Sequence, residues 1–211
     1  MKAVIICGGL RPSLSLIKSE IEESDLLICA DSGANCLYEY NILPDYLVGD
    51  FDSIDEVVLK YFSNKECKIE RFPRDKDFTD SQLAVKRAKE MGVEEIVLLG
   101  CSGSRLDHTL GNIGLLKECA EMNIKASLKD ENNCLTITDK PIELVSRIGQ
   151  IFSLQAYCDC VENLTIKGAK YKLNNYNLKL GDSRTISNEF LSNRVNIEFT
   201  SGLLLVILSN D

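Results

Sequence analysis

The 211-residue sequence contains no tryptophan, one histidine, four prolines and no long hydrophobic segment. A single histidine, His108, excludes a metal site built from several histidines. The longest apolar run near the C-terminus, Leu203–Leu208, is far shorter than the roughly 20 residues of a membrane-spanning helix. Ala3–Cys7 is likewise too short for the core of a signal peptide. We therefore expect a cytoplasmic protein with no membrane partner.

Positive charge is also scarce, because 24 lysines and arginines face 32 aspartates and glutamates, giving a net charge of -8. This balance argues against a nucleic-acid partner, which would require a basic surface. It is compatible with phosphate binding where a metal ion lies between carboxylate and phosphate. Hydrophobic residues make up 45% of the chain, enough for a well-buried core.

The nine cysteines are odd in number and irregularly spaced, and no C-x-x-C pair occurs. Cys7, Cys29 and Cys101 lie within apolar runs that are typical of strands. The pattern argues against a disulfide framework and a zinc site. We expect reduced, partly buried thiols, as in the cytoplasm.

Residues 1–130 alternate short apolar runs with helical patterns, which predicts a Rossmann-like parallel sheet of βα units. Thr79 and Gln82 form a capping-box pattern at the start of the clearest helix, and Gly92 ends it. The predicted strands are Ala3–Cys7, Leu26–Ala30, Tyr46–Val48, Lys68–Arg71, Ile96–Leu99 and Ile124–Leu128. The predicted helices cover residues 13–23, 33–40, 54–62, 79–90 and 108–121.

Residues 131–211 have a different character, because short alternating runs are separated by glycines and no helix-length pattern remains. This predicts a small antiparallel β-sandwich domain. Its predicted strands are Cys134–Thr138, Ile151–Ala156, Leu164–Lys167, Asn177–Leu180, Val195–Phe199 and Leu203–Leu208.

Aspartates occur at four successive strand-to-helix junctions of the first domain. They are Asp31 after the second strand, Asp50 and Asp52 after the third, Asp77 and Asp80 after the fourth, and Asp107 after the fifth. Since the carboxyl ends of parallel strands share one edge of the sheet, we expect these side chains to converge there. Converging carboxylates repel one another unless a positive charge compensates them, and Mg²⁺ with bound phosphates would do so.

Taken singly, each aspartate also has an ordinary structural explanation. Asp80 and Asp107 suit the first turn of a helix, and Asp31 suits a turn. The period-2 spacing of Asp50 and Asp52 lets both carboxylates face one side of an extended segment. Lys76 and Arg105 are the cations placed among these acids, and no P-loop motif is present. The turns Gly8-Gly9 and Ser102-Gly103-Ser104 are weak indications of phosphate binding.

Several short motifs follow one another in an order typical of one enzyme family. They are Asp31-Ser32-Gly33-Ala34-Asn35, Leu43-Pro44-Asp45, Gly49-Asp50-Phe51-Asp52-Ser53, Asp77-Phe78-Thr79-Asp80, Gly103-Ser104-Arg105-Leu106-Asp107-His108, Ile186-Ser187-Asn188-Glu189 and Ser201-Gly202-Leu203-Leu204. Together they resemble the motifs of the thiamin pyrophosphokinases over nearly the whole chain. Ser32 and Ser104 stand where that family usually has glycine.

The resemblance implies a Mg²⁺-dependent transfer of pyrophosphate from ATP to the hydroxyl of thiamin, giving thiamin diphosphate and AMP. It also implies a homodimer whose active site lies between the acidic edge of one protomer and the β domain of the other. The implied metal ligands are Asp50, Asp52 and Asp80. Asp31, Asp77, Asp107 and Arg105 are the implied catalytic residues, Asn35, Ser102 and Arg105 the ATP contacts, and Asp77, Thr79, Ser187 and Asn188 the thiamin contacts.

Two questions stay open at the level of sequence. Either Asp107 or Asp77 could accept the proton of the thiamin hydroxyl. The alternative functions are those of a hydroxymethylpterin pyrophosphokinase, a D-x-D glycosyltransferase, an aspartate-nucleophile phosphatase and a non-catalytic thiamin sensor. The β domain with Ser187 and Asn188 argues against the pterin enzyme, and the position of the D-x-D pair after the third strand argues against the phosphatase.

Overall fold

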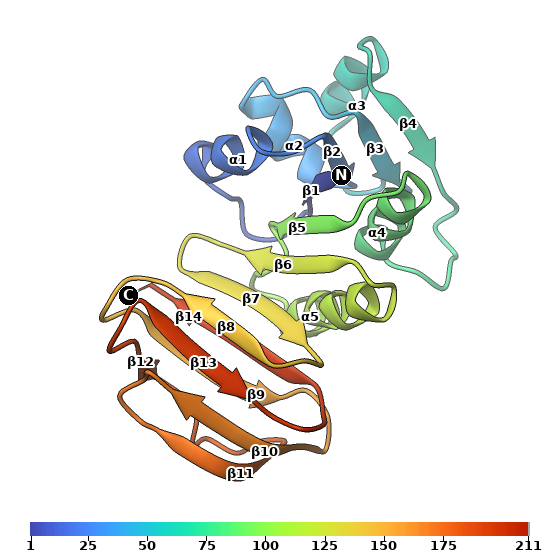
Figure 1. Ribbon diagram of the computed structural model, residues 1–211. Coiled ribbons are helices and arrows are strands. Elements are labelled where there is room, and N and C mark those ends of the chain that lie inside the picture. The colour runs from blue at the N-terminus through green and yellow to red at the C-terminus, as the bar shows by residue number, and fades with distance from the viewer. Residues whose placement is uncertain (211) are drawn as a thin grey trace. The chain divides into compact units, whose positions relative to one another are not determined.

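The computed structural model describes residues 1–210 (Figure 1), and the chain divides into two compact units between Glu131 and Asn132. Each unit has a hydrophobic core of its own. No helix among residues 1–210 is both long and apolar enough to cross a membrane. All nine cysteines are free.

The first unit is built on parallel strands in the order β6-β5-β1-β2-β3-β4. Their bounds are β1 Lys2–Ile6, β2 Leu26–Ala30, β3 Tyr46–Gly49, β4 Lys68–Arg71, β5 Glu95–Leu99 and β6 Lys125–Lys129. The central strands β1 and β2 are buried along almost their whole length, which is typical of a sheet covered on both faces. The predicted Rossmann-like sheet is confirmed, with strand ends that differ by a residue or so.

Helices cover both faces of this sheet (Figure 1). Their bounds are α1 Leu14–Ile21, α2 Gly33–Glu39, α3 Glu56–Ser63, α4 Asp80–Glu90 and α5 Leu106–Glu121. The first three share one core with alternate residues of the strands, including Ile17, Leu37 and Phe62. By contrast, α4 packs against β1, β2 and β3, and α5 packs against β6 and α4.

Two helix starts show how local signals act. The predicted capping box of α4 is confirmed: the Gln82 N–H donates to Oγ1 of Thr79 at 3.2 Å, and the Thr79 N–H donates to Oε1 of Gln82 at 3.1 Å. The α5 helix begins at Leu106, two residues before the predicted start at 108. Its first turn was missed because first-turn residues need not follow the apolar periodicity that marks a helix.

The second unit is an antiparallel sandwich, as predicted. Its strands form two layers, in the orders β12-β9-β14-β7 and β11-β10-β13-β8, and side chains from both layers share one core. Phe152 and Phe190 meet edge to face in this core, with ring centroids 5.2 Å apart. The strands are β7 Asn133–Thr138, β8 Ile142–Val145, β9 Ile151–Ala156, β10 Cys160–Lys167, β11 Leu173–Lys179, β12 Asn188–Glu189, β13 Arg194–Glu198 and β14 Leu204–Ser209.

The sequence did not predict β8, β12, the first half of β10 or the first half of β11, for which the predicted strand began only at Asn177. The β10 register shifts between Val161 and Leu164, and Asn163 has φ 56°. This bulge interrupts the alternation of apolar and polar residues on which the prediction relied. The β12 strand has two residues, too few for any alternation to be visible.

Candidate active site

A cleft of about 660 Å³ lies at the carboxyl edge of the first unit's sheet. Strands β1 and β5 are neighbours there, but the chain leaves them toward helices α1 and α5 on opposite faces. Such a topological switch point is where open parallel sheets bind their ligands. The loops after the two strands join through hydrogen bonds, from the Gly9 N–H to the Gly100 carbonyl at 2.7 Å and from the Leu10 N–H to the Ser102 carbonyl at 2.6 Å.

The cleft contains about half of the residues that the sequence predicted for the site. Predicted residues that line it are Asp31, Asp52, Thr79, Asp80, Ser102 and Arg105. Residues that were not predicted also line it, among them Cys7, Arg11, Ser81, Cys101, Thr109 and Asn112. Several of these unpredicted residues could have been found from the glycine-rich turns after β1 and β5. Glycine-rich turns let the backbone approach a ligand closely, so residues in and beside them are candidates for a binding site.

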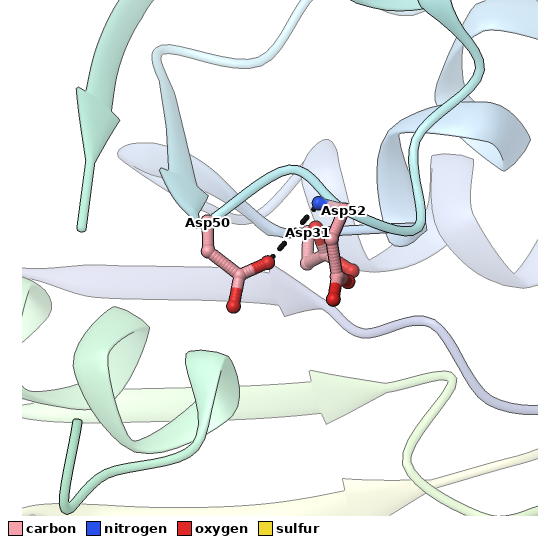
Figure 2. A group of neighbouring side chains, drawn as sticks. All are labelled: Asp31, Asp50 and Asp52. Atoms are coloured by element: carbon pink, nitrogen blue, oxygen red, sulfur yellow. Dashed lines mark hydrogen bonds between the residues drawn. The ribbon is translucent and has the colours of Figure 1, made fainter. Parts of the chain in front are cut away.

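The carboxylates of Asp31, Asp50 and Asp52 lie together, with one oxygen of each within 4.8 Å of the others (Figure 2). Backbone conformation brings them together, because Asp31 and Phe51 both adopt left-handed φ angles, of 43° and 67°. The buried Phe51 ring anchors the turn between its two aspartates. The Asp52 N–H then donates to Oδ1 of Asp50 at 3.1 Å.

Gly49 makes room for this arrangement. Its φ of 156° is rare for residues with a side chain. A β-carbon at this position would lie 3.1 Å from Cβ of Asp31 and 3.3 Å from Oδ1 of Asp80. The glycine therefore lets Asp80, from the start of α4, approach the other acids. We refer to Asp31, Asp50, Asp52 and Asp80 as the acidic cluster.

Lys76 lies between two members of the acidic cluster. Its Nζ is 3.0 Å from Oδ2 of Asp50 and 3.0 Å from Oδ1 of Asp80. Burial opposes the charged form of both partners, but hydrogen bonds outweigh it. The Asp52 N–H and Lys76 lower the pKa of Asp50, while Asp80 and Asp50 raise the pKa of Lys76.

Asp31 is the least compensated member of the cluster. It is 9% exposed, and its Oδ1 is buried without a hydrogen-bond partner. Burial, together with the nearby charges of Asp80, Asp50 and Asp52, raises its pKa.

Closely spaced carboxylate oxygens, one of them buried and unpartnered, are a donor set that suits a hard divalent cation. The sequence predicted Asp50, Asp52 and Asp80 as the metal ligands. The three carboxylates whose oxygens lie within 4.8 Å of one another are instead those of Asp31, Asp50 and Asp52.

Three predicted ligand contacts also have structural partners within the unit. The Thr79 hydroxyl caps α4, and the Ser102 hydroxyl donates to Asp130 at 3.1 Å. Asn35 ties α2 to the loop after β3: its Nδ2 donates to the Ser53 carbonyl at 3.4 Å, and its Oδ1 accepts from the Asp55 N–H at 3.3 Å. These side chains hold the edges of the cleft in place.

The structure does not bring Asp77 or Asp107 into the acidic cluster. Asp77 is exposed in the loop before α4. Asp107 is exposed and pairs with Arg105, whose Nη2 lies 2.6 Å from its Oδ2. The hydrogen bond from Arg105 lowers the pKa of Asp107, which makes this carboxylate a weaker base. Arg105 itself lines the cleft beside the N-terminus of α5.

In the second unit, Ser187 and Asn188 differ sharply although they are adjacent. Asn188 is 2% exposed, and its amide makes three hydrogen bonds. Its Oδ1 accepts from the N–H groups of Tyr171 and Glu189 at 3.0 and 2.9 Å, and its Nδ2 donates to the Tyr171 carbonyl at 2.9 Å. Ser187 is exposed at a left-handed φ of 57°, so its hydroxyl is presented to solvent.

Comparison with protein families gives two matches, which together span most of the chain. The model of the thiamin pyrophosphokinase catalytic domain matches residues 17–128. The model of the thiamin pyrophosphokinase vitamin B1 binding domain matches residues 139–204. These segments fall within the first and the second unit respectively.

Individual relatives agree with the family models. Thiamine pyrophosphokinase from Bacillus subtilis is 33% identical over 215 residues, which covers 100% of both chains. A crystal structure of thiamine pyrophosphokinase from Bacillus subtilis superposes with a TM-score of 0.89 at 30% identity, covering 100% of each chain. The crystal structure of a thiamin pyrophosphokinase family protein from Enterococcus faecalis gives a TM-score of 0.88 at 26% identity, again over 100% of each chain.

Proposed function

This chain belongs to the thiamin pyrophosphokinase family, and on that premise we propose that its acidic cluster and switch-point cleft carry out the transfer of pyrophosphate from ATP to thiamin. The enzyme is an ATP-dependent diphosphotransferase. The products are thiamin diphosphate and AMP.

One observation carries the assignment of the site. The cleft of about 660 Å³ lies at the topological switch point and has acidic carboxylates on one side and glycine-rich turns on the other. The turns leave backbone close to the cleft, and the α5 N-terminus beside them favours anions such as a triphosphate. The carboxylates would repel that triphosphate unless a cation lies between them.

We propose Mg²⁺ as that cation, held by Asp50, Asp52 and Asp80 with Asp31 beside them. The buried, unpartnered Oδ1 of Asp31 and the spacing of the three closest carboxylates support a hard divalent ion here. When bound, Mg²⁺ would neutralise negative charge on the phosphates during transfer.

The protein's own residues position the reactants. The thiamin hydroxyl attacks the β-phosphorus of ATP, the bond from that phosphorus to the oxygen bridging the α-phosphate breaks, and AMP leaves with this oxygen. Such transfers depend on alignment and charge stabilisation rather than on a covalent intermediate. Arg105 offers a guanidinium to the phosphates, for which its planar donors are suited. Asn35 and Ser102 hold the loops on which the nucleotide would rest.

The hydroxyl proton must pass to a base, and Asp77 and Asp107 remain the candidates. The structure gives them different environments, because Arg105 lowers the pKa of Asp107 while Asp77 is exposed. We therefore favour Asp77 as the acceptor, and assign to Asp107 the orientation of Arg105. Asp77 and Thr79 would then lie near thiamin.

We further propose that the enzyme is a homodimer in which the exposed Ser187 of one protomer contacts thiamin in the site of the other, while the buried Asn188 holds the turn that carries Ser187. The exposed large apolar side chains of Val145 and Ile148, at the end of β8 and directly after it, support a partner surface there. At a thiamin concentration where Ser187→Ala is severely impaired by its raised KM, mixing it with inactive Asp52→Asn should give more activity than the two proteins separately, provided that subunits exchange. A fully active monomer would contradict this proposal.

We also propose that the enzyme is located in the cytoplasm. The nine free cysteines support it, since thiols persist in reducing compartments. Fractionation with an antibody to the native protein would test it.

The function itself is tested by incubating the protein with thiamin, ATP and Mg²⁺ and following AMP and thiamin diphosphate together. The two products should appear in equal amounts, and a chelator should abolish both. Replacing thiamin by a hydroxymethylpterin distinguishes the pterin enzyme, and a nucleotide-sugar turnover screen distinguishes a glycosyltransferase. Thiamin binding without release of AMP would indicate a sensor instead of an enzyme.

A further inference from the structure

Lys76 occupies an unusual position for a lysine, because its ammonium is largely buried between carboxylates. The Lys76 side chain is 12% exposed, and its partners Asp50 and Asp80 are 13% and 25% exposed. Both contacts are 3.0 Å long. Arg74 contacts the same cluster differently, since its guanidinium lies 3.1 Å from Asp52 but is 80% exposed.

The position of the ammonium conflicts with a metal ion. Oδ2 of Asp50 and Oδ1 of Asp80 face Nζ of Lys76, and these two residues belong to the proposed metal ligands. A divalent cation bound by the same carboxylates would lie within a few ångströms of the ammonium, where like charges repel strongly in a partly buried site. Metal and ammonium therefore exclude one another from these oxygens.

We propose that Lys76 is an internal counterion that competes with the metal for Asp50 and Asp80, and that it pairs with nucleotide phosphate once the metal has displaced it. The inference rests on the proposed function, because it takes the acidic cluster as the metal site. As a consequence, the site favours metal that arrives together with ATP over metal that arrives alone. Free metal binds weakly, since it must displace an ion-paired lysine, whereas metal that arrives with ATP also brings a new anionic partner for the lysine.

The long, flexible stem of lysine fits this role. Lys76 lies in the loop between β4 and α4, outside both regular elements, so its side chain can turn without unfolding either of them. A lysine is a compact point charge that can exchange one anionic partner for another. The loop position thus provides the movement that competition requires.

The test measures binding of Mn²⁺ alone, without nucleotide, by its paramagnetic effect on water-proton relaxation. Mn²⁺ prefers the same carboxylate ligands as Mg²⁺. Lys76→Gln should bind Mn²⁺ about tenfold more tightly than the wild type, because the competing charge is gone. Lys76→Arg, which keeps the charge, should stay close to the wild type. Arg74→Gln is the matched control, since it removes an exposed positive charge from the same cluster and should change the affinity far less.

A second readout separates competition from simple loss of packing. Metal-free Lys76→Gln should melt at a lower temperature than the wild type, because its carboxylates lose their counterion, and Mn²⁺ should raise its melting temperature by more. If Lys76→Gln does not fold, the wild type still provides a test by reductive methylation with mass spectrometry. Mg²⁺ should then increase labelling of Lys76 but leave that of the exposed Lys172 unchanged.

The outcomes distinguish this inference from the proposed function. If the wild type binds Mn²⁺ and Lys76→Gln binds it no more tightly, the competition is disproved while the metal site stands. Unchanged labelling of Lys76 on addition of Mg²⁺ would also disprove it. If neither protein binds Mn²⁺, with ATP or without it, both the metal site and the competition are wrong.

Discussion

The acidic cluster of the first unit and the Ser187-Asn188 turn of the second unit hold their polar groups in opposite ways. In the cluster, like charges lie within 4.8 Å of one another, and a buried oxygen of Asp31 has no hydrogen bond. In the turn, the buried amide of Asn188 makes three hydrogen bonds. The first arrangement is compensated only in part, by Lys76, until a ligand binds, whereas the second is complete without one. A substitution in the cluster should therefore affect catalysis, and a substitution of Asn188 should affect stability.

The largest expected effect is on turnover in the acidic cluster. Asp52→Asn should lower kcat by at least about 100-fold, because it removes a carboxylate that holds the charge-neutralising cation. The melting temperature of the metal-free protein should hold or rise, because one of the repelling charges is gone. Steady-state kinetics and calorimetry measure the two quantities.

Asp55→Asn is the matched control, since Asp55 is an exposed aspartate of the same loop and precedes α3. It should retain near-normal turnover. Near-normal turnover in Asp52→Asn as well would remove Asp52 from the metal site.

The next effect concerns stability in the second unit. Asn188→Ala should lower the free energy of unfolding by about 2–3 kcal/mol, because backbone groups of Tyr171 and Glu189 lose the buried amide that pairs with them. Urea denaturation measures this loss. Ser187→Ala is the adjacent control: it should leave stability nearly unchanged but raise the KM for thiamin several-fold, with little effect on the KM for ATP. Equal losses of stability in both variants would contradict the distinction.

A smaller effect is the pH dependence contributed by Asp31. Its pKa is raised in the folded state by burial and by Asp80, Asp50 and Asp52, so the folded protein binds this proton at higher pH than the unfolded chain does. The contribution of Asp31 to the free energy of unfolding should therefore rise as pH falls from neutral through the raised pKa, and level off below the unfolded pKa.

Asp31→Asn should remove this contribution. In the presence of a chelator it should be more stable than the wild type near neutral pH, and the difference should shrink on acidification. Urea denaturation over a pH series measures it, and the opposite contribution of Asp50, whose pKa is lowered, cancels in the comparison. A difference that grows on acidification would contradict the assignment.

The smallest effect is expected at the exposed pair of Arg105 and Asp107. Asp107→Asn should leave the melting temperature unchanged, because exposed ion pairs add little to stability. Turnover should fall less than in Asp52→Asn if Asp107 orients Arg105 and does not accept the proton. A loss as large as that of Asp52→Asn, with a changed pH profile of kcat, would instead identify Asp107 as the base.

Much of the fold was predictable because it depends on local patterns. Apolar runs and helical periodicity predicted the parallel strands and helices of the first unit, and the Thr79–Gln82 capping box formed as the sequence indicated. Parallel topology then required that the junction aspartates lie at one edge of the sheet, which made the region of the site predictable as well. The strands β8 and β12, which escaped prediction, are short. The first halves of β10 and β11 also escaped it, and the register between these two strands shifts there.

The sequence by itself thus determined the elements, their order and the edge at which the acids gather. Only the tertiary structure decided which acids meet, because that depends on the left-handed backbone of Asp31 and Phe51 and on the space left by Gly49. It also placed Lys76 between Asp50 and Asp80, left Asp107 exposed with Arg105, and buried Asn188 while exposing Ser187. Loop conformation and side-chain burial arise from contacts between residues far apart in the chain, and no local pattern encodes them.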